Sequence, residues 1–297
     1  MTRGDGMNWF ALATASALLS AAAALAQKRV LQRAHALEFS LLVAVAVLLF
    51  SLPVPFTTAV FAFDARTLAL LAGKSVLGGL AFLLVMTALE RNPIGEALPL
   101  LGLTPAVTAL VALVVLGEGL RAGQWLGVGL MLAGCWALEA RAGAGALRPL
   151  ADAFGGRHRA ILGAVVLFAV SSVGDRLLVA GMKVPPFVVL FHQHAIYLLV
   201  YALLLAARPG RWRAVGAVAR AEWPWLVLIA LCTIGYRWFQ LAAVRTGPVA
   251  LVLAVKRMSI LYATLLAGRL FSEERRGRRL LGAALIVAAG FLFLGSE

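Results

Sequence analysis

Charged residues are scarce in this 297-residue chain. Lysine, arginine, aspartate and glutamate make up 13% of it, whereas hydrophobic residues make up 62%. A soluble domain carries roughly 45–50% apolar and about 25% charged residues, so a single soluble core cannot hide this excess of apolar side chains. Lipid must be the solvent for much of the surface. The apolar runs are continuous and near the ~20 residues that a spanning helix needs, which favours helices over a barrel and predicts an all-α membrane protein.

Several chemical signatures are missing as well. The chain has only two cysteines, Cys135 and Cys232, and both lie inside apolar runs without the spacing of a zinc site or a disulfide framework. We find no nucleophile–base arrangement, metal cluster, phosphate-binding loop or nucleotide fingerprint. We therefore expect no catalytic residues, no metal and no cofactor, and neither an enzyme nor a primary pump.

The net charge of +14 would suggest a nucleic-acid partner in a soluble protein. Most of the excess is loop arginine, which orients membrane helices. We expect the partners to be the lipid bilayer and a small-molecule substrate, with no nucleic acid.

Ten membrane spans can be identified from the apolar runs and their breaks. Prolines mark three helix starts, in Asn92-Pro93, Pro185-Pro186 and Gly247-Pro248, and Gly117-Glu118-Gly119 marks a helix end. The glycine-rich stretch 143–157 is linker-like and divides the chain into 1–142 and 158–297. The expected spans are at about 7–26, 37–53, 67–89, 93–116, 122–140, 159–181, 185–206, 223–244, 247–270 and 278–295.

The two halves repeat each other at a fixed offset of 155 residues. The matching pairs are Pro93 with Pro248, Thr104 with Ser259, Leu116 with Phe271, Glu118 with Glu273, and Gly127 with Gly282. Because five helices are an odd number, the second copy must enter the membrane from the opposite side. This indicates two inverted five-helix repeats, an arrangement common among secondary transporters, with substrate near the midplane between the halves.

The sequence resembles the ten-helix EamA-type branch of the drug/metabolite transporter superfamily. The resemblance rests on Ala88-Leu89-Glu90-Arg91-Asn92-Pro93, Leu103-Thr104-Pro105, Leu116-Gly117-Glu118 and the run from Gly127 to Gly134, with its counterpart from Val244 to Gly290. It implies an EamA-type five-helix repeat in each half and transport of metabolites, without specifying the substrate. The implied location is the plasma or inner membrane.

Loop charges predict the orientation in the membrane. The loops on the side of the N-terminus, here called side one, hold five basic residues, whereas the loops of the opposite side hold seventeen. The positive-inside rule places the more basic side in the cytoplasm, so we expect both termini outside. This departs from the ten-helix relatives, whose termini face the cytoplasm. The five on side one are Arg3, Arg66, Arg121, Lys183 and Arg245.

Charged side chains inside the expected spans are functional candidates, because each costs at least ~2.5–3.5 kcal/mol at the bilayer centre. From side one, Lys74, Arg237 and Lys256 lie ~11–13 Å along their helices and Arg176 ~8 Å, which predicts one cavity with an anion site. A flanking cation, Arg257, follows Lys256, and the acids that join these cations are Glu96 and Asp175.

Lys256 and Arg257 form the sharpest candidate site. The pair resembles the Lys-Arg pair on the ninth helix of plastid triose-phosphate/phosphate translocators, where it binds the substrate phosphate. The resemblance implies that Lys256 acts as a point charge and Arg257 as a bidentate fork for phosphate or carboxylate. The rest of that site is not recognisable here, and an internal ion pair with Asp175 is the structural alternative.

Other residues are candidates for the substrate site with structural alternatives. Arg237 and Gln240 share a helical face with Thr233, and Tyr236 could stack on a substrate or pack in the core. Asp175 and Arg176 lie near a helix end, where snorkelling to the headgroups competes. Lys74 has no polar companion on its own face, which favours snorkelling.

Three residues are candidates for proton coupling. Glu96 lies in the first turn of a helix, where a carboxylate also suits the helix N-terminus. His192 and His194 could relay protons near neutral pH, although their apolar neighbours are typical of hydrogen-bonded core histidines. Small faces for helix packing or homodimer contacts are offered by Gly127, Gly134, Gly282 and Gly290.

We therefore predict a secondary active transporter of small anionic or zwitterionic metabolites, bearing phosphate or carboxylate, that works by alternating access. The nearest alternative is an exporter of amino acids or amphipathic compounds. A lipid-headgroup flippase or a membrane enzyme is the alternative of another class. Glu96 and Asp175 lie at opposite membrane sides, which disfavours an acid–base pair.

Overall fold

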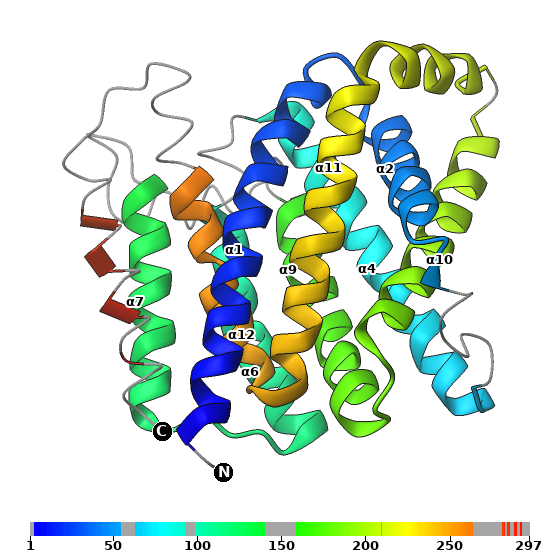
Figure 1. Ribbon diagram of the computed structural model, residues 1–297. Helices are drawn as coiled ribbons and strands as arrows, with labels where there is room; N and C mark the ends of the chain where they lie inside the picture. The colour runs from blue at the N-terminus through cyan, green and yellow to red at the C-terminus, as the bar shows by residue number, and fades with distance from the viewer. Residues whose placement is uncertain are drawn as a thin grey trace.

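The computed structural model describes residues 3–54, 63–92, 99–139, 159–208 and 210–263, together with short pieces between 281 and 292. In these ranges every regular element is a helix (Figure 1), so the all-α class is confirmed. Among the described residues, five helices are long and apolar enough to cross a membrane: Trp9–Leu31, Ala65–Arg91, Arg159–Gly181, Pro186–Ala206 and Trp212–Thr246. Two shorter apolar helices, Ala36–Phe50 and Leu100–Leu116, accompany them.

Most of the described elements follow the expected spans, but the helix Trp212–Thr246 begins earlier than expected and the span expected at 247–270 is interrupted after Lys256. The tenth span, 278–295, and the linker 143–157 lie largely or wholly outside the described residues, so the number ten, the domain limits and the inverted repeat stay predictions. In chain order the elements are α1 (Arg3–Leu31), α2 (Ala36–Phe50), α4 (Ala65–Arg91), η1 (Pro99–Leu103), α6 (Thr104–Leu116), α7 (Ala122–Glu139), α9 (Arg159–Arg176), η2 (Leu177–Gly181), α10 (Pro186–Ala206), α11 (Trp212–Thr246) and α12 (Val249–Lys256).

Helix ends lie where the local chemistry places them. α10 begins at Pro186, and α12 begins directly after Pro248. Proline fits the start of a helix because the backbone N–H that it lacks makes no helical hydrogen bond in the first turn. α6 ends at Gly117, which caps it in the left-handed conformation with φ of 68°. The Asp64 side chain caps α4 by accepting hydrogen bonds from Thr67, and the bond from the Thr67 side chain is the main reason that the pKa of Asp64 is lowered.

α11 is longer than the expected span 223–244. It begins at Trp212 and contains a kink at Glu222, two residues before Pro224. Proline removes a helical hydrogen bond and bends the helix on its N-terminal side. The first turns of α11 therefore run in a different direction from the rest of the helix (Figure 1). Trp212 and Trp223 are 51% and 63% exposed, as expected of tryptophan at a membrane–water interface.

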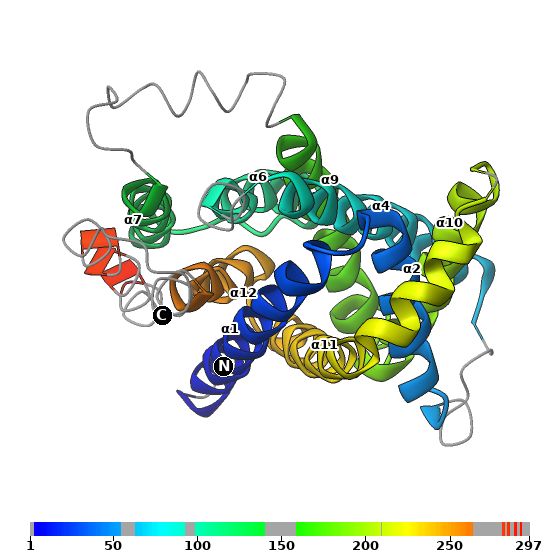
Figure 2. The same ribbon diagram turned by 90° about the horizontal axis from the view of Figure 1, so that it is seen from above.

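The two halves of the chain interleave in the bundle. α1 packs most extensively on α11, and α4 packs most extensively on α9. α2 contacts both α10 and α11, while α6 contacts α9 and α12. In Figure 2 the bundle is seen along its length, with α1 beside α11 and α12, and α4 beside α9. A site between these helices is therefore built from both halves.

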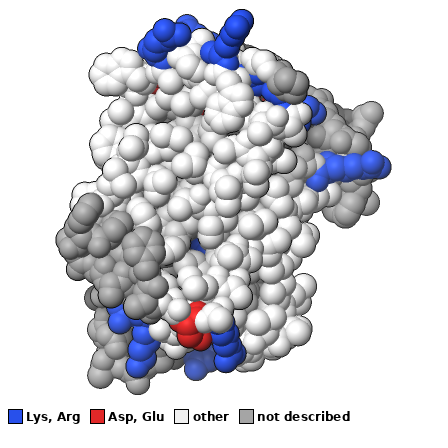
Figure 3. Space-filling model, turned by 90° about the vertical axis from the view of Figure 1, so that its right-hand side faces the viewer, with Lys and Arg blue, Asp and Glu red and all other residues white. Residues whose placement is uncertain are grey.

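One face of the described surface has charged ends and an apolar belt between them. In Figure 3 the lysine and arginine side chains gather at the two ends of the molecule, and the described face between them is nearly free of charge. Among the described residues, leucine and valine side chains such as Leu110, Val114 and Leu203 are more than half exposed. Such a continuous apolar surface fits a lipid environment.

Candidate functional site

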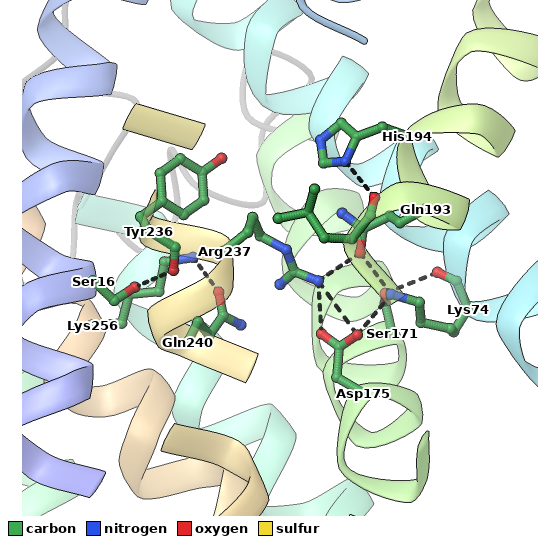
Figure 4. A network of polar contacts seen from close by, with 11 residues as sticks. Ser16, Lys74, Ser171, Asp175, Gln193, His194, Tyr236, Arg237, Gln240 and Lys256 are labelled. Atoms are coloured by element: carbon green, nitrogen blue, oxygen red, sulfur yellow. Dashed lines mark hydrogen bonds and ion pairs between the residues drawn. The ribbon is translucent and has the colours of Figure 1, made fainter. Parts of the chain in front are cut away.

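Asp175 is the centre of a buried polar cluster built from four helices. Its carboxylate accepts hydrogen bonds from Lys74 Nζ at 2.7 Å and from Arg237 Nη2 at 3.1 Å. The Gln193 side-chain oxygen accepts from the same two cations, at 2.6 and 2.5 Å. The four residues come from α9, α4, α11 and α10, and Figure 4 shows their side chains converging. Two cations thus share one carboxylate and one amide oxygen.

Close packing of α4 on α9 places Lys74 beside Asp175. Gly174 lies so near that a Cβ atom there would be 2.8 Å from the Lys74 Cβ. Ser171, one turn earlier on α9, donates to the Lys74 backbone carbonyl at 2.9 Å. The Lys74 side chain is only 2% exposed. Snorkelling of Lys74 is therefore wrong: its polar companions lie on neighbouring helices, which its own helix face cannot reveal.

Lys256 has a different environment. Its Nζ donates to Gln240 Oε1 at 2.5 Å and lies 4.5 Å from the centre of the Tyr236 ring. Both partners are neutral, and among the described residues no carboxylate forms an ion pair with Lys256. The alternative of an internal pair with Asp175 is wrong for Lys256, because Lys74 and Arg237 take that carboxylate.

The backbone is interrupted beside this lysine. α12 ends at Lys256, Arg257 is in a turn, and the helix resumes at residues 258–263. Arg257 Nη2 donates to Thr104 Oγ1 at 2.9 Å. Thr104 is the first residue of α6, where the five-residue 3₁₀ turn η1 gives way to the α-helix. The contact therefore joins two irregular points of the membrane-spanning backbone.

Both centres line one cavity of about 80 Å³. Arg237 lies between them in Figure 4, with Asp175 on one side and Tyr236, Gln240 and Lys256 on the other. The cavity is lined mainly by polar side chains: Ser40, Ser171, Ser172, Asp175, Gln193, His194, Tyr197, Thr233, Tyr236, Arg237, Gln240, Lys256 and Arg257, together with Val43, Ala44, Phe82, Phe168 and Leu253. Room for a few water-sized groups among so many charges is typical of a site for a polar ligand.

Arg176 lies outside this cavity, contrary to its prediction as a substrate-binding residue. Its Nε donates to Glu118 Oε1 at 2.6 Å, and its Nη1 donates to the carbonyls of Val244 and Arg245 at 2.6 and 3.0 Å. Arg176 follows Asp175 directly, and neighbouring residues on a helix face different directions. The side chain thus ties the end of α9 to the end of α11.

The proton-coupling candidates differ in their position relative to the cavity. His194 lines the cavity, and its Nδ1 lies 2.9 Å from the Leu190 carbonyl. His192 contacts the Val188 carbonyl and packs against Phe63 and Phe191 instead of lining the cavity. Glu96 lies outside the described residues. Gln193, which connects both cations of the Asp175 cluster, was missed because a single amide between two histidines gave no signal of its own.

The part of the chain that the structure describes contains no group of three histidine, cysteine, aspartate or glutamate side chains that could hold a metal ion.

Comparison with known proteins now adds to this geometry. Residues 7–139 match the EamA-like transporter family. The EamA-type resemblance is thereby confirmed over this segment, and the family consists of membrane transporters of small molecules. The EamA match covers α1 through α7, which supply Lys74 and Thr104 to the site.

The fold has a counterpart among solved structures. One crystal structure of a protein superposes with a TM-score of 0.73 and covers 98% of this chain and 97% of the other at 21% sequence identity. This likeness shows that the two chains share a fold over nearly their whole lengths. No curated protein sequence matches the chain significantly.

Proposed function

We propose that this protein is a secondary active transporter of small anionic or zwitterionic metabolites that works by alternating access. The substrate's phosphate or carboxylate group binds Lys256 and Arg257, and Arg237 lines the same cavity between them and Asp175. The family match supports transport of small molecules, and the charges around the cavity support the choice of an anion.

One observation carries this proposal: the environment of Lys256. An ammonium group removed from water needs compensation by an anion or by several good acceptors. Lys256 has one amide oxygen and one aromatic face, and an aromatic face contributes only about 0.5–2 kcal/mol. A substrate anion would supply the missing charge, and it would be held more strongly there than in water because the cavity has a low dielectric.

The irregular backbone at this point supports a transporter site. The start of α6 at Thr104 and the residue Ser259, just after the interruption at Arg257, are 155 residues apart. This is the offset at which the two halves of the sequence match. Interrupted helices in corresponding positions of two repeats are the best pointer to a transporter's binding site, and Arg257 bonds to Thr104 across the two.

Helix packing supports the inverted repeat. We exchange each helix of the first half with its counterpart in the second: α1 with α9, α4 with α11, and α6 with α12. The α1–α11 contact then becomes the α9–α4 contact, and the α6–α9 contact becomes the α12–α1 contact. When α2 is also exchanged with α10, the α2–α11 contact becomes the α10–α4 contact. A pattern that survives this exchange is what two equivalent units, 1–142 and 158–297, would produce.

Two end contacts support the same division. Lys28 Nζ, near the end of α1, donates to the Leu89 carbonyl at 2.5 Å and the Asn92 carbonyl at 2.9 Å. Arg176, at the end of α9, donates to the carbonyls of Val244 and Arg245. Leu89 and Val244 are again 155 residues apart. In each half, a cation of the first helix caps the carboxyl end of the third.

Ligand-induced thermal stabilisation of the purified protein tests the proposal. Phosphate and acetate are the probes for anions, and choline chloride is the cationic probe, all at matched ionic strength. We expect the anions to raise the unfolding temperature through linkage and choline to have no effect. Lys256→Gln should lose the response, because glutamine keeps the hydrogen bonding but not the charge.

Lys183→Gln is the matched control, since Lys183 lies in the turn before α10 and does not line the cavity. It should respond to anions like the parent. Stabilisation by choline alone, or an anion response that survives Lys256→Gln, would overturn the anion site. Anion-driven counterflow in proteoliposomes then tests transport itself.

A further inference from the structure

A second cavity, of about 90 Å³, adjoins the first. The two share five lining residues: Phe82, Phe168, Tyr236, Lys256 and Arg257. The basic pair and three aromatic rings therefore lie at the boundary between two chambers. We call the one around Asp175 the polar chamber and the other the apolar chamber.

The apolar chamber has a different lining. It lies between α1, α4 and the segment after α12, and most of its own wall is aliphatic, including Ala24, Val85, Met86, Leu89 and Ile260. Its polar contributions are neutral: two serines and Gln27. A group that leaves Lys256 in this direction thus meets hydrocarbon, where burial contributes about 0.8 kcal/mol per methylene.

We propose that the substrate is a carboxylate with a short aliphatic tail, whose head binds Lys256 and Arg257 and whose tail fills the apolar chamber. This inference rests on the proposed function and names the substrate class of the same site. The volume of the apolar chamber limits the size of the aliphatic tail that it can hold. A dry cavity of about 150 Å³ holds a benzene molecule, so 90 Å³ favours a short chain over a ring.

The test uses straight-chain carboxylates as probes: acetate, butanoate, hexanoate and decanoate, each titrated against the unfolding temperature of the purified protein. We expect the apparent dissociation constant to fall about 3- to 4-fold per added methylene, the equivalent of about 0.8 kcal/mol, until the chamber is full. It should then level off or rise with decanoate, because further methylenes no longer fit.

Two alanines on α1 provide a matched pair of variants. Ala24 lines the apolar chamber, whereas Ala22 is exposed on the lipid-facing side of the same helix. Ala24→Leu should abolish the gain in affinity from acetate to hexanoate. Ala22→Leu should keep the whole chain-length series, which separates chamber filling from a general effect of the longer acids on detergent or lipid.

Met86→Ala covers the case in which Ala24→Leu does not fold. It enlarges the apolar chamber, so the optimum should move to a longer acid. Equal affinity for all four acids, or a chain-length series unchanged by both Ala24→Leu and Met86→Ala, overturns the tail assignment. That result leaves the anion site intact as long as acetate binding depends on Lys256. Absence of any carboxylate response is a failure of the proposed function instead.

Discussion

Two basic centres face the same cavity, and they are balanced in opposite ways. At Asp175, two cations from α4 and α11 share a carboxylate and an amide oxygen, and the Lys74 and Asp175 side chains are each only 2% exposed. At Lys256, the ammonium has an amide oxygen and an aromatic face. The first centre carries its own counter-ion, whereas the second has only neutral partners among the described residues.

This difference separates structure from function inside one cavity. Breaking a buried ion pair leaves an uncompensated charge and is strongly destabilising, whereas an ammonium without a counter-ion contributes little to stability or opposes it. The Asp175 centre should therefore hold α4, α9, α10 and α11 together, and the Lys256 centre should matter for the ligand. Variants of the two centres can be ranked by their effect on unfolding.

The largest effect is expected from Asp175→Asn. The change leaves Lys74 and Arg237 facing each other without a carboxylate, and loss of one partner of a buried pair costs about 3–5 kcal/mol. The free energy of unfolding in detergent should fall by that amount. Lys74→Met/Asp175→Asn should recover part of the loss, because the stranded ammonium is gone. A variant as stable as the parent would show that the pair is not structural.

Gly174→Ala should have the next largest effect, lowering the free energy of unfolding by about 1–3 kcal/mol. The added Cβ would lie 2.8 Å from Lys74 Cβ, and overpacking at a tight helix contact has this order of cost. Gly181→Ala is the control, since a Cβ there meets nothing within 4 Å. Thermal unfolding of the two variants gives the comparison; equal stability would mean that α4 and α9 can separate without cost.

Glu118→Gln should lower the free energy of unfolding by less than about 1 kcal/mol. The Glu118–Arg176 pair is partly exposed, with 23% and 21% of the two side chains accessible, so solvent screens it. Arg176 also keeps its two carbonyl acceptors. Salt titration is the sharper measurement: the difference between parent and variant should shrink as ionic strength rises, and a difference independent of salt would contradict a screened pair.

The smallest effect on unfolding is expected from Lys256→Gln in the absence of ligand. Removing a cation without a counter-ion relieves a desolvation cost, so the unfolding temperature should stay the same or rise slightly. A loss comparable to that of Asp175→Asn would place both centres in the same structural class and remove the distinction between them.

Sequence reasoning predicted the parts of this architecture that depend on local chemistry. The proline starts of α10 and α12 and the glycine end of α6 were each predicted from a dipeptide or tripeptide and are confirmed. The presence of cations within the spans was also visible, since a charge in a long apolar run is conspicuous. Such features depend on a few neighbouring residues, which the sequence displays directly.

Partners across helices could not be predicted in the same way. Lys74 and Asp175 are 101 residues apart in the chain, and their contact depends on which helix faces α9. The sequence therefore left Asp175 with several candidate partners, and it gave Lys74 none. Arg176 was placed in the site because of its depth, although depth does not determine the direction in which a side chain points.

The kink in α11 also fixes where the cavity lies within the electric field of an energised membrane. Trp223 is exposed beside the bend, and Arg237 follows it by 14 residues, about 21 Å along the helix. Thr246, the end of α11, is only 9 residues further, about 14 Å. An anion arriving from the end of Thr246 crosses about two fifths of the potential, and one from the other face crosses about three fifths. At about 2.3 kcal/mol per charge per 100 mV, voltage alone would give the two faces unequal apparent affinities.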